Sequence, residues 1–335
     1  MKSIVCHGAR DLRIEERSTQ SRAMPKARQQ PGLQPSPTTQ HSEVLAASPI
    51  RCAKARRGAW EFRDAIQMIG IRLMKFSALV WLSSLVTLSI AAHPSPPPQV
   101  VDLPTRPGIT VRILALIPET PKATVILLSG GDGGVQIFPG GSMGRFPGNF
   151  LLRSRQRFVV HGLAVVVVDA PSDRARPPYL RGFRHSAEHS QDLAAVIEWA
   201  AKHAAPKVWL VGTSRGTESA AAAGLKLQGM PALAGVVLTS SILVDNETTP
   251  VPALQLPELR LPILVVHHER DTCRVTRFSD LTKLTARLPT SVAHRVVTVS
   301  GGISEGGDCE GMSYHGFNGR EEEVVGDIVR WIDAN

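Results

Sequence analysis

The sequence predicts an α/β fold in which a mostly parallel central sheet is covered by helices on both faces. From about residue 100 onwards, short runs of aliphatic and β-branched residues alternate with longer segments of helical periodicity. The clearest strand is 163–169 (LAVVVVD), an unbroken apolar run of the kind that is buried on both faces of a parallel sheet. The clearest helix is 186–204, where apolar residues from Leu193 to Ala200 recur on one face.

A second strong signal is the stretch 207–216 (KVWLVGTSRG), which predicts a buried strand that turns sharply into the Ala-rich helix 217–227. The turn has the pattern G-x-S-x-G, in which a tight strand-to-helix bend exposes the serine hydroxyl above the sheet. The pentapeptide alone is not specific, because it recurs around Ser142 and Ser304. Neither of these lies between a strand and a helix, so Ser214 is the candidate nucleophile.

The remaining elements complete the alternation. Further strands are predicted at 111–117, 123–128, 233–243, 263–267 and 296–299, and further helices at 149–161, 278–288 and 320–332. The strands 111–117 and 123–128 are expected to be joined by a turn. The connection between 233–243 and 263–267 is short and rich in proline, which leaves no room for a large lid domain. We therefore expect one domain over residues 100–335.

The N-terminal part of the chain has a different composition. Residues 1–73 are rich in Arg, Gln, Ser and Pro and have no sustained apolar period, so this basic extension is predicted to be disordered. The net charge of +9 lies mostly there, since 1–73 has 13 Lys and Arg against 6 Asp and Glu, whereas 93–335 has 24 against 23. A near-neutral main domain gives no electrostatic support for nucleic-acid binding.

Residues 74–92 (MKFSALVWLSSLVTLSIAA) have the layout of a secretory signal peptide, and 93–99 form a Pro-rich spacer. Because signal peptides begin at the N-terminus, we expect translation to start at Met74 or Met68 and the protein to be exported, either periplasmic or secreted. A signal anchor is the alternative, since the apolar stretch 76–92 is just long enough to span a bilayer. Membrane attachment is expected only if that stretch is retained.

With the nucleophile turn in this setting, residues from about 100 to the C-terminus resemble the α/β-hydrolase superfamily, and within it the small esterases without a lid and the dienelactone-hydrolase-like proteins. The resemblance implies that an acid and a histidine follow the serine on the loops after the last two strands. Those positions correspond to Asp271 and His315. Glu269 and Asp245 are alternatives for the acid, whereas His294 begins a strand and lies at the wrong end of a parallel sheet.

The resemblance also implies an oxyanion hole made of two backbone amides. One is that of Arg215, directly after the serine, and the other lies in the glycine-rich loop 129–134 (SGGDGG). We favour Gly131, with Asp132 as the alternative, because the family commonly has His-Gly where this chain has Ser129-Gly130. Phosphate binding by this loop is the competing reading, but the nucleotide-binding fingerprints are absent.

The function implied is that of a serine hydrolase, which cleaves carboxylic esters through an acyl-enzyme intermediate. Its expected partner is a small-molecule ester, and the mechanism requires no cofactor. A peptidase, lactonase, thioesterase or acyltransferase would use the same residues. A non-catalytic binding protein on this scaffold is the alternative from another class.

Two features remain open at this point. A working triad brings Cys273 and Cys309 together, so a disulfide is expected in an exported protein, with two free thiols as the alternative. No metal site is expected, because these cysteines are not a close-spaced ligand pair.

The loop 171–186 is expected to overhang the site. Its arginines, with Tyr179 and Phe183, could bind an acidic or aromatic ester, or the arginines could simply be solvated.

Overall fold

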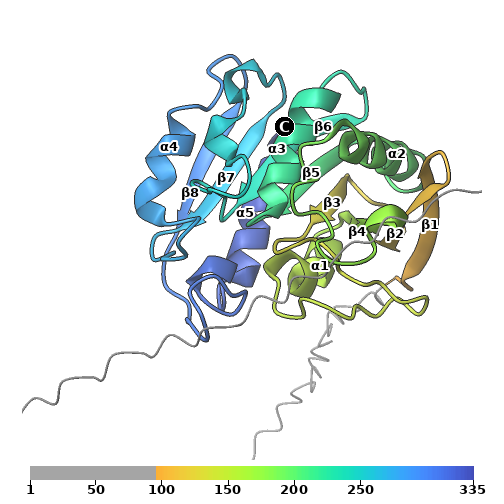
Figure 1. Ribbon diagram of the computed structural model, residues 1–335, viewed down its shortest axis with the longest axis horizontal. Helices are drawn as coiled ribbons and strands as arrows, with labels where there is room; N and C mark the ends of the chain where they lie inside the picture. The colour runs from red at the N-terminus through yellow and green to blue at the C-terminus, as the bar shows by residue number, and fades with distance from the viewer. Residues whose placement is uncertain (1–95) are drawn as a thin grey trace, which may run out of the picture. The chain divides into compact units, whose positions relative to one another are not determined.

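The computed structural model describes residues 96–335, and these form an eight-stranded sheet with helices on both faces (Figure 1). The strand order is β1-β2-β4-β3-β5-β6-β7-β8, and β3 to β8 pair in parallel. Only β2 runs against this direction, pairing antiparallel with both β1 and β4. The strands are β1 (Gln99–Arg106), β2 (Ile109–Leu116), β3 (Thr124–Leu128), β4 (Ala164–Pro171), β5 (Val208–Thr213), β6 (Leu233–Thr239), β7 (Ile263–His268) and β8 (His294–Val299).

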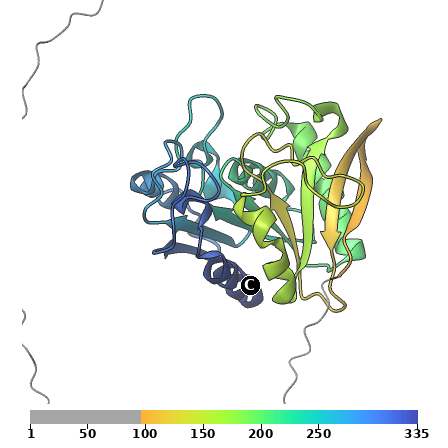
Figure 2. The ribbon, with the colours of Figure 1, turned by 90° about the horizontal axis from the view of Figure 1, so that it is seen from below.

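Two hydrophobic clusters, one on each face of the sheet, hold the helices. The α-helices are α1 (Phe150–Val160), α2 (Ala187–His203), α3 (Gly216–Leu227), α4 (Leu281–Thr285) and α5 (Glu321–Ala334). Buried side chains of α1 and α5 belong to one cluster, and those of α2, α3 and α4 belong to the other. Figure 2 shows α5 (dark blue) beside α1 (yellow-green) on the same side of the sheet. The predicted fold class, a mostly parallel sheet between helices, is therefore confirmed.

The central strands are buried along their whole length, as their unbroken apolar sequences predict. Every residue of β3 (TVILL) and of β5 (VWLVGT) is buried. The loop between β6 and β7 contains only short 3-10 turns in the described chain, so no large lid lies over the sheet. The 3-10 turns of the chain are η1 (Ser172–Arg174), η2 (Val251–Ala253), η3 (Leu256–Glu258), η4 (Phe278–Asp280) and η5 (Tyr314–Gly316).

Three details of the sequence prediction were wrong, each for a local reason. β1 was missed because its sequence, QVVDLPTR, contains Pro104 and lies at the sheet edge, half-exposed, where proline is tolerated. β6 ends at Thr239 because Ser240 has a φ of 45°. The expected helix 278–288 divides into η4 and the short α4.

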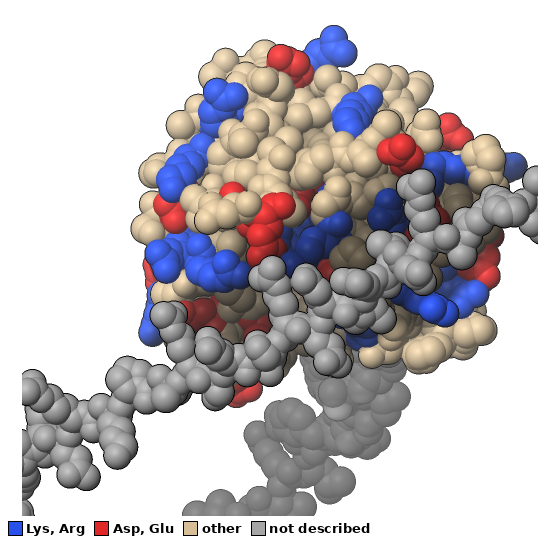
Figure 3. Space-filling model, in the orientation of Figure 1, with Lys and Arg blue, Asp and Glu red and all other residues tan. Residues whose placement is uncertain are grey.

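The N-terminal predictions concern residues that the structure does not describe. The basic extension, the signal peptide and the first part of the spacer, up to residue 95, lie outside the described residues. Between residues 96 and 335, no helix is long and apolar enough to cross a membrane. On the face shown in Figure 3, basic and acidic side chains are interspersed, in keeping with the near-neutral charge of this part of the sequence.

One close contact inside the sheet can be tested by substitution. Gly235 on β6 pairs with Trp209 on β5, and a Cβ added at Gly235 would overlap the Trp209 ring. We expect Gly235→Ala to lower the free energy of unfolding by about 1–3 kcal/mol, because the buried ring must shift. Gly229→Ala is the matched control, since a Cβ there meets open space. Urea denaturation of both variants checks this, and equal midpoints would contradict it.

Candidate active site

The predicted nucleophile lies in a strained turn between β5 and α3. Ser214 has a φ of 52°, a left-handed conformation that is rare for a residue other than glycine. Its amide donates a hydrogen bond to the Thr239 carbonyl at 3.0 Å, which fixes the turn to the end of β6. Glycine is required on both sides. A Cβ at Gly216 would collide with the Leu128 carbonyl of β3, and one at Gly212 would collide with the backbone of Gly216.

The predicted base and acid lie on the loops after the last two strands. Asp271 follows β7, and His315 lies in η5, before α5. The Nδ1 of His315 is 3.0 Å from Oδ2 of Asp271, and both side chains are buried. Because the carboxylate is an acceptor, Nδ1 carries the hydrogen and Nε2 is left as the acceptor of the neutral ring.

Three further contacts fix this pair. Asp271 accepts hydrogen bonds from the Cys273 amide and the Thr276 hydroxyl, each at 3.0 Å. The hydroxyl of Ser240 donates to the His315 carbonyl at 2.6 Å. Sequence reasoning missed Thr276 and Ser240, because only the folded loops bring these hydroxyls to the site. The carboxylate of Asp271 is thus held in one orientation by donors on its own loop.

Ser214 and His315 line the same cavity, which has a volume of about 480 Å³. Gly130 and Gly131, from the loop after β3, line the cavity as well. The walls are largely apolar and come from two segments that are distant in the sequence. The other lining residues are Phe146, Pro147, Gly148, Asn149, Phe150, Thr213, Cys309, Glu310, Gly311, Met312 and Gly316.

Of the two predicted oxyanion donors, Gly131 lines this cavity, and Arg215 directly follows Ser214, which lines it. In the described part of the chain, neither the Arg215 amide nor the Gly131 amide donates a hydrogen bond to a protein acceptor. Gly131 lines the cavity, whereas Asp132, the alternative, does not. The Asp132 carboxylate instead pairs with Arg145 at 2.9 Å. The geometry therefore favours Gly131.

The other candidates are found elsewhere in the structure. Asp245 forms an ion pair with the Arg215 side chain at 2.5 Å, and Glu269 is exposed. His294 is exposed at the start of β8, as expected. Ser142 and Ser304, which carry the other two G-x-S-x-G matches, lie in exposed loops.

A disulfide bond joins Cys273 and Cys309, as the sequence analysis expects. Cys273 lies two residues after Asp271, and Cys309 lies in the cavity wall, six residues before His315. The bond therefore connects the loop that carries the predicted acid to the segment that carries the predicted base.

The loop 171–186 contacts the protein interior rather than the cavity. Tyr179 and Phe183 are buried, and the Arg174 guanidinium lies 4.5 Å from the Phe183 ring centre. Arg184 is 3% exposed, so solvation does not account for it. None of these residues lines the cavity, and the possibility that they bind an ester is not supported.

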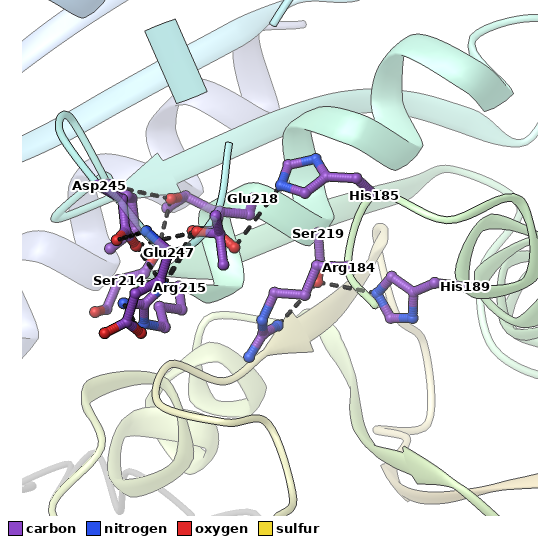
Figure 4. A network of polar contacts seen from close by, with 12 residues as sticks. Arg184, His185, His189, Ser214, Arg215, Glu218, Ser219, Asp245 and Glu247 are labelled. Atoms are coloured by element: carbon purple, nitrogen blue, oxygen red, sulfur yellow. Dashed lines mark hydrogen bonds and ion pairs between the residues drawn. The ribbon is translucent and has the colours of Figure 1, made fainter. Parts of the chain in front are cut away.

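Arg184 belongs to a buried polar network behind the glycine-rich loop (Figure 4). Its Nη1 donates to Ser219 Oγ at 2.8 Å, and His189 Nε2 lies 2.9 Å from the same oxygen. Burial lowers the pKa of Arg184 to about 10 and that of His189 to about 3. Sequence reasoning missed this network, because nothing in the pattern around Ser219 marks it as a polar contact.

Comparisons with known proteins bear on the fold. Neither protein-family models nor curated proteins match the chain. Among solved structures, a dienelactone hydrolase from Anabaena variabilis is similar, with 17% sequence identity over 71% of this chain and 98% of that one, and a TM-score of 0.51. A proposed dienelactone hydrolase from Klebsiella pneumoniae has 13% identity over the same shares and a TM-score of 0.52.

The chain has the α/β-hydrolase fold. The resemblance stated from the sequence is confirmed at this level, and the positions of Ser214, Asp271 and His315 follow the order expected for that fold. At such low sequence identity the comparison is evidence for the fold alone, and the chemistry has to be inferred from the residues of the site.

The disulfide is expected to contribute to stability. The bridge closes a segment with a sequence separation of 36 residues, and the chain-entropy model then gives about 4 kcal/mol. We expect the double variant Cys273→Ser, Cys309→Ser to lose about 2–4 kcal/mol in free energy of unfolding by urea denaturation. Reductant should shift the wild-type midpoint toward that of the variant and leave the variant itself unchanged. An unchanged wild-type midpoint after full reduction would contradict the expectation.

The lowered pKa of the buried His189 side chain predicts that the folded chain loses stability in acid. Its pKa is about 3 in the folded chain and 6.5 as the ordinary value, so between these pH values only the unfolded chain binds the proton. The free energy of unfolding therefore falls as pH falls below 6.5, by about 1.4 kcal/mol per pH unit from this residue. Burial also lowers the pKa values of His185 and His267, which act in the same direction.

Urea denaturation between pH 7 and pH 4 measures this effect. We expect His189→Gln to reduce the slope of the unfolding free energy against pH by about the contribution of one proton. His203→Gln, at the exposed end of the same helix, is the matched control. A slope that His189→Gln leaves at the wild-type value would show that this imidazole is protonated in the folded chain.

Proposed function

We propose that the protein is a serine hydrolase that cleaves carboxylic esters, with Ser214 as nucleophile, His315 as general base and Asp271 as the group that orients the base. One observation carries the proposal. A serine held at a φ of 52° on a strand-to-helix turn shares a cavity with a histidine whose Nδ1 is bonded to a buried carboxylate. Strain of this kind is kept where the surrounding structure over-determines it, as at reactive groups.

The chemistry follows from these positions. A serine hydroxyl is a weak nucleophile at neutral pH, so Nε2 of His315 removes its proton as Oγ of Ser214 attacks the ester carbonyl. The imidazolium that forms is stabilised by Asp271, and it then protonates the leaving alcohol. Water, activated by the same ring, attacks the acyl-enzyme and releases the acid. This sequence uses only side chains of the chain and requires no cofactor.

The negative charge of the tetrahedral intermediate requires donors that are already in place. We assign this role to the backbone amides of Gly131, which lines the cavity, and Arg215, which directly follows Ser214. Neither amide donates to a protein acceptor in the described residues. Such preorganised donors act where charge develops, and removal of one typically costs about 10²–10³ in kcat.

The cavity lining narrows the substrate class. Its aromatic and aliphatic walls include Phe146, Phe150 and Met312, and its volume of about 480 Å³ admits a small ester. Glu310 is the one carboxylate among the lining residues, and no lysine or arginine is among them. We therefore propose neutral esters with short or compact acyl groups as substrates, in preference to anionic ones.

Export is part of the proposal. The Cys273–Cys309 disulfide is typical of an oxidising compartment, and it agrees with the signal peptide predicted at 74–92. We propose that the enzyme acts in the periplasm or outside the cell.

Labelling with a fluorophosphonate probe tests the nucleophile. We expect the full-length, oxidised protein to be labelled and to hydrolyse p-nitrophenyl acetate, and Ser214→Ala to lose both properties because no other hydroxyl is activated. Ser304→Ala, which alters an exposed match to the same pentapeptide, is the control and keeps both. Asp271→Asn is expected to lower kcat by about 10⁴, since the amide stabilises the wrong tautomer of the base.

Other outcomes separate the alternatives. Labelling without ester turnover would direct the search to lactones, thioesters and peptides, which the same residues would cleave. Labelling that persists in Ser214→Ala would overturn the assignment of the nucleophile. A folded protein that is neither labelled nor active would favour the binding-protein reading.

A further inference from the structure

Arg184 is a buried charged residue to which the proposed mechanism gives no function. Arg184 comes from the loop before α2, and its side chain is inaccessible to solvent behind the glycine-rich loop. Arginine is rarely fully buried unless its donors are used, because desolvation of the charge is unfavourable. Figure 4 shows the Arg184 side chain directed toward Ser219 of α3, the helix that begins immediately after the proposed nucleophile.

The guanidinium bonds to two carbonyls of the glycine-rich loop. Nη2 of Arg184 donates to the carbonyl of Ser129 at 3.2 Å and to that of Gly131 at 3.1 Å. The loop follows the guanidinium closely, since a Cβ added at Gly133 would lie 2.8 Å from Nη2. The guanidinium therefore bonds to the first and the third of three successive peptide units in this loop.

The third bond fixes the guanidinium to the nucleophile helix. Burial lowers the pKa of His189 to about 3, so its ring is neutral at physiological pH, and its Nε2 lies within hydrogen-bond distance of Ser219 Oγ, at 2.9 Å. Ser219 Oγ is then the acceptor for Nη1 of Arg184, at 2.8 Å. Ser219 therefore links Arg184 to His189 through a hydrogen bond on each side.

The two carbonyls that Arg184 holds belong to the peptide units on either side of the Gly131 amide. In a trans peptide the C=O and the N–H of one unit point in opposite directions. The units that begin at Ser129 and Gly131 are fixed by the guanidinium. The unit between them carries the N–H of Gly131, so its neighbours on both sides are anchored. Since Gly130 and Gly131 line the cavity, this places a fixed amide beside Ser214.

We propose that Arg184 is the positioning residue for the oxyanion hole. It holds the Gly131 amide in the orientation that binds the tetrahedral intermediate, and it fixes that amide relative to α3 and Ser214. The proposal rests on the proposed function, because it assigns Arg184 to the esterase reaction. Charge-assisted bonds from one planar group suit this role, since they fix direction as well as distance.

The test compares Arg184→Met and Arg184→Lys with Arg181→Met. Arg181 is an exposed residue of the same loop, and its pairing with Glu247 is at the surface. We expect Arg184→Met to lower kcat for p-nitrophenyl acetate by about 10–100-fold, with KM changed by less than about threefold. Arg184→Lys retains the charge as a compact ammonium without the planar fork, and we expect a loss in kcat of about tenfold. Arg181→Met should remain within about twofold of wild type.

Binding of phenylboronic acid gives a readout that a purely structural role would not change. Its tetrahedral adduct with the serine places an oxygen in the oxyanion hole, so we expect its affinity to fall in parallel with kcat. The pH dependence of kcat/KM should keep its wild-type shape, because the His315–Asp271 pair is intact.

The outcomes separate the two proposals. An inactive, unlabelled wild type would overturn the proposed function, and the role of Arg184 with it. An active wild type with kcat and boronate affinity unchanged in both Arg184 variants would overturn this inference alone, even if their melting temperatures fall. If Arg184→Met does not fold, Arg184→Lys decides the question, since wild-type kcat in that variant contradicts the role.

Discussion

The close approach of the backbone between β3 and the start of α3 is the constraint on which the site depends. Only a residue without a side chain fits at Gly216, where the helix begins against the Leu128 carbonyl. This contact brings the loop after β3 against the turn that carries Ser214, with Gly130 packed beside the serine Cβ. The positive φ of Ser214 then directs its side chain to the cavity instead of into the sheet. Ser214 and the glycine-rich loop are neighbours because the two backbones can approach this closely.

Around this contact, buried polar groups of α3 bond to loops that come from other strands. Arg215 and Glu218, at the start of α3, meet the loop after β6 through Asp245 and Thr248. Ser219, one residue further, meets Arg184 from the loop after β4. Burial raises the pKa of Glu218, which shows how far from water this end of the helix lies. Hydrogen bonds and ion pairs are directional. They therefore fix the position of these loops relative to α3, which apolar contacts alone would not do.

Sequence analysis located the residues whose place is set by the order of strands and loops along the chain. It missed the residues whose place is set by hydrogen bonds between segments that are distant in the sequence. Ser214 is marked by its local turn, and Asp271 and His315 follow from the rule that loops at the carboxyl ends of parallel strands meet. Asp169 has no such mark, although its carboxylate accepts bonds from the amides of Val135, Gln136 and Ile137. The apolar pattern of a strand indicates that the strand is buried. It does not indicate which distant backbone amides a polar residue near the end of the strand will bond.

For the arginine-rich loop 171–186, the expected solvation holds for Arg176 and Arg181, which are exposed, but not for Arg184, which is buried. Its composition is that of a solvated surface, yet Tyr179 is buried with the Arg145 guanidinium 4.6 Å from its ring centre. Aromatic rings and guanidinium groups are compatible in the interior when they stack. Composition alone does not distinguish such stacks from a hydrated loop.

The antiparallel pairing of β1 and β2 determines at which end of the sheet the chain ahead of Gln99 enters the fold. Gln99 pairs with Ala115, which pairs with Val166 near the start of β4, so the chain enters the sheet at the amino ends of its parallel strands. The cavity lies at the opposite, carboxyl ends. A solid support, a fusion partner or a lipid anchor joined ahead of Gln99 would therefore attach at the base of the sheet. The cavity mouth would face the bulk solution, and the cavity of an immobilised protein would stay open to small molecules without an added spacer.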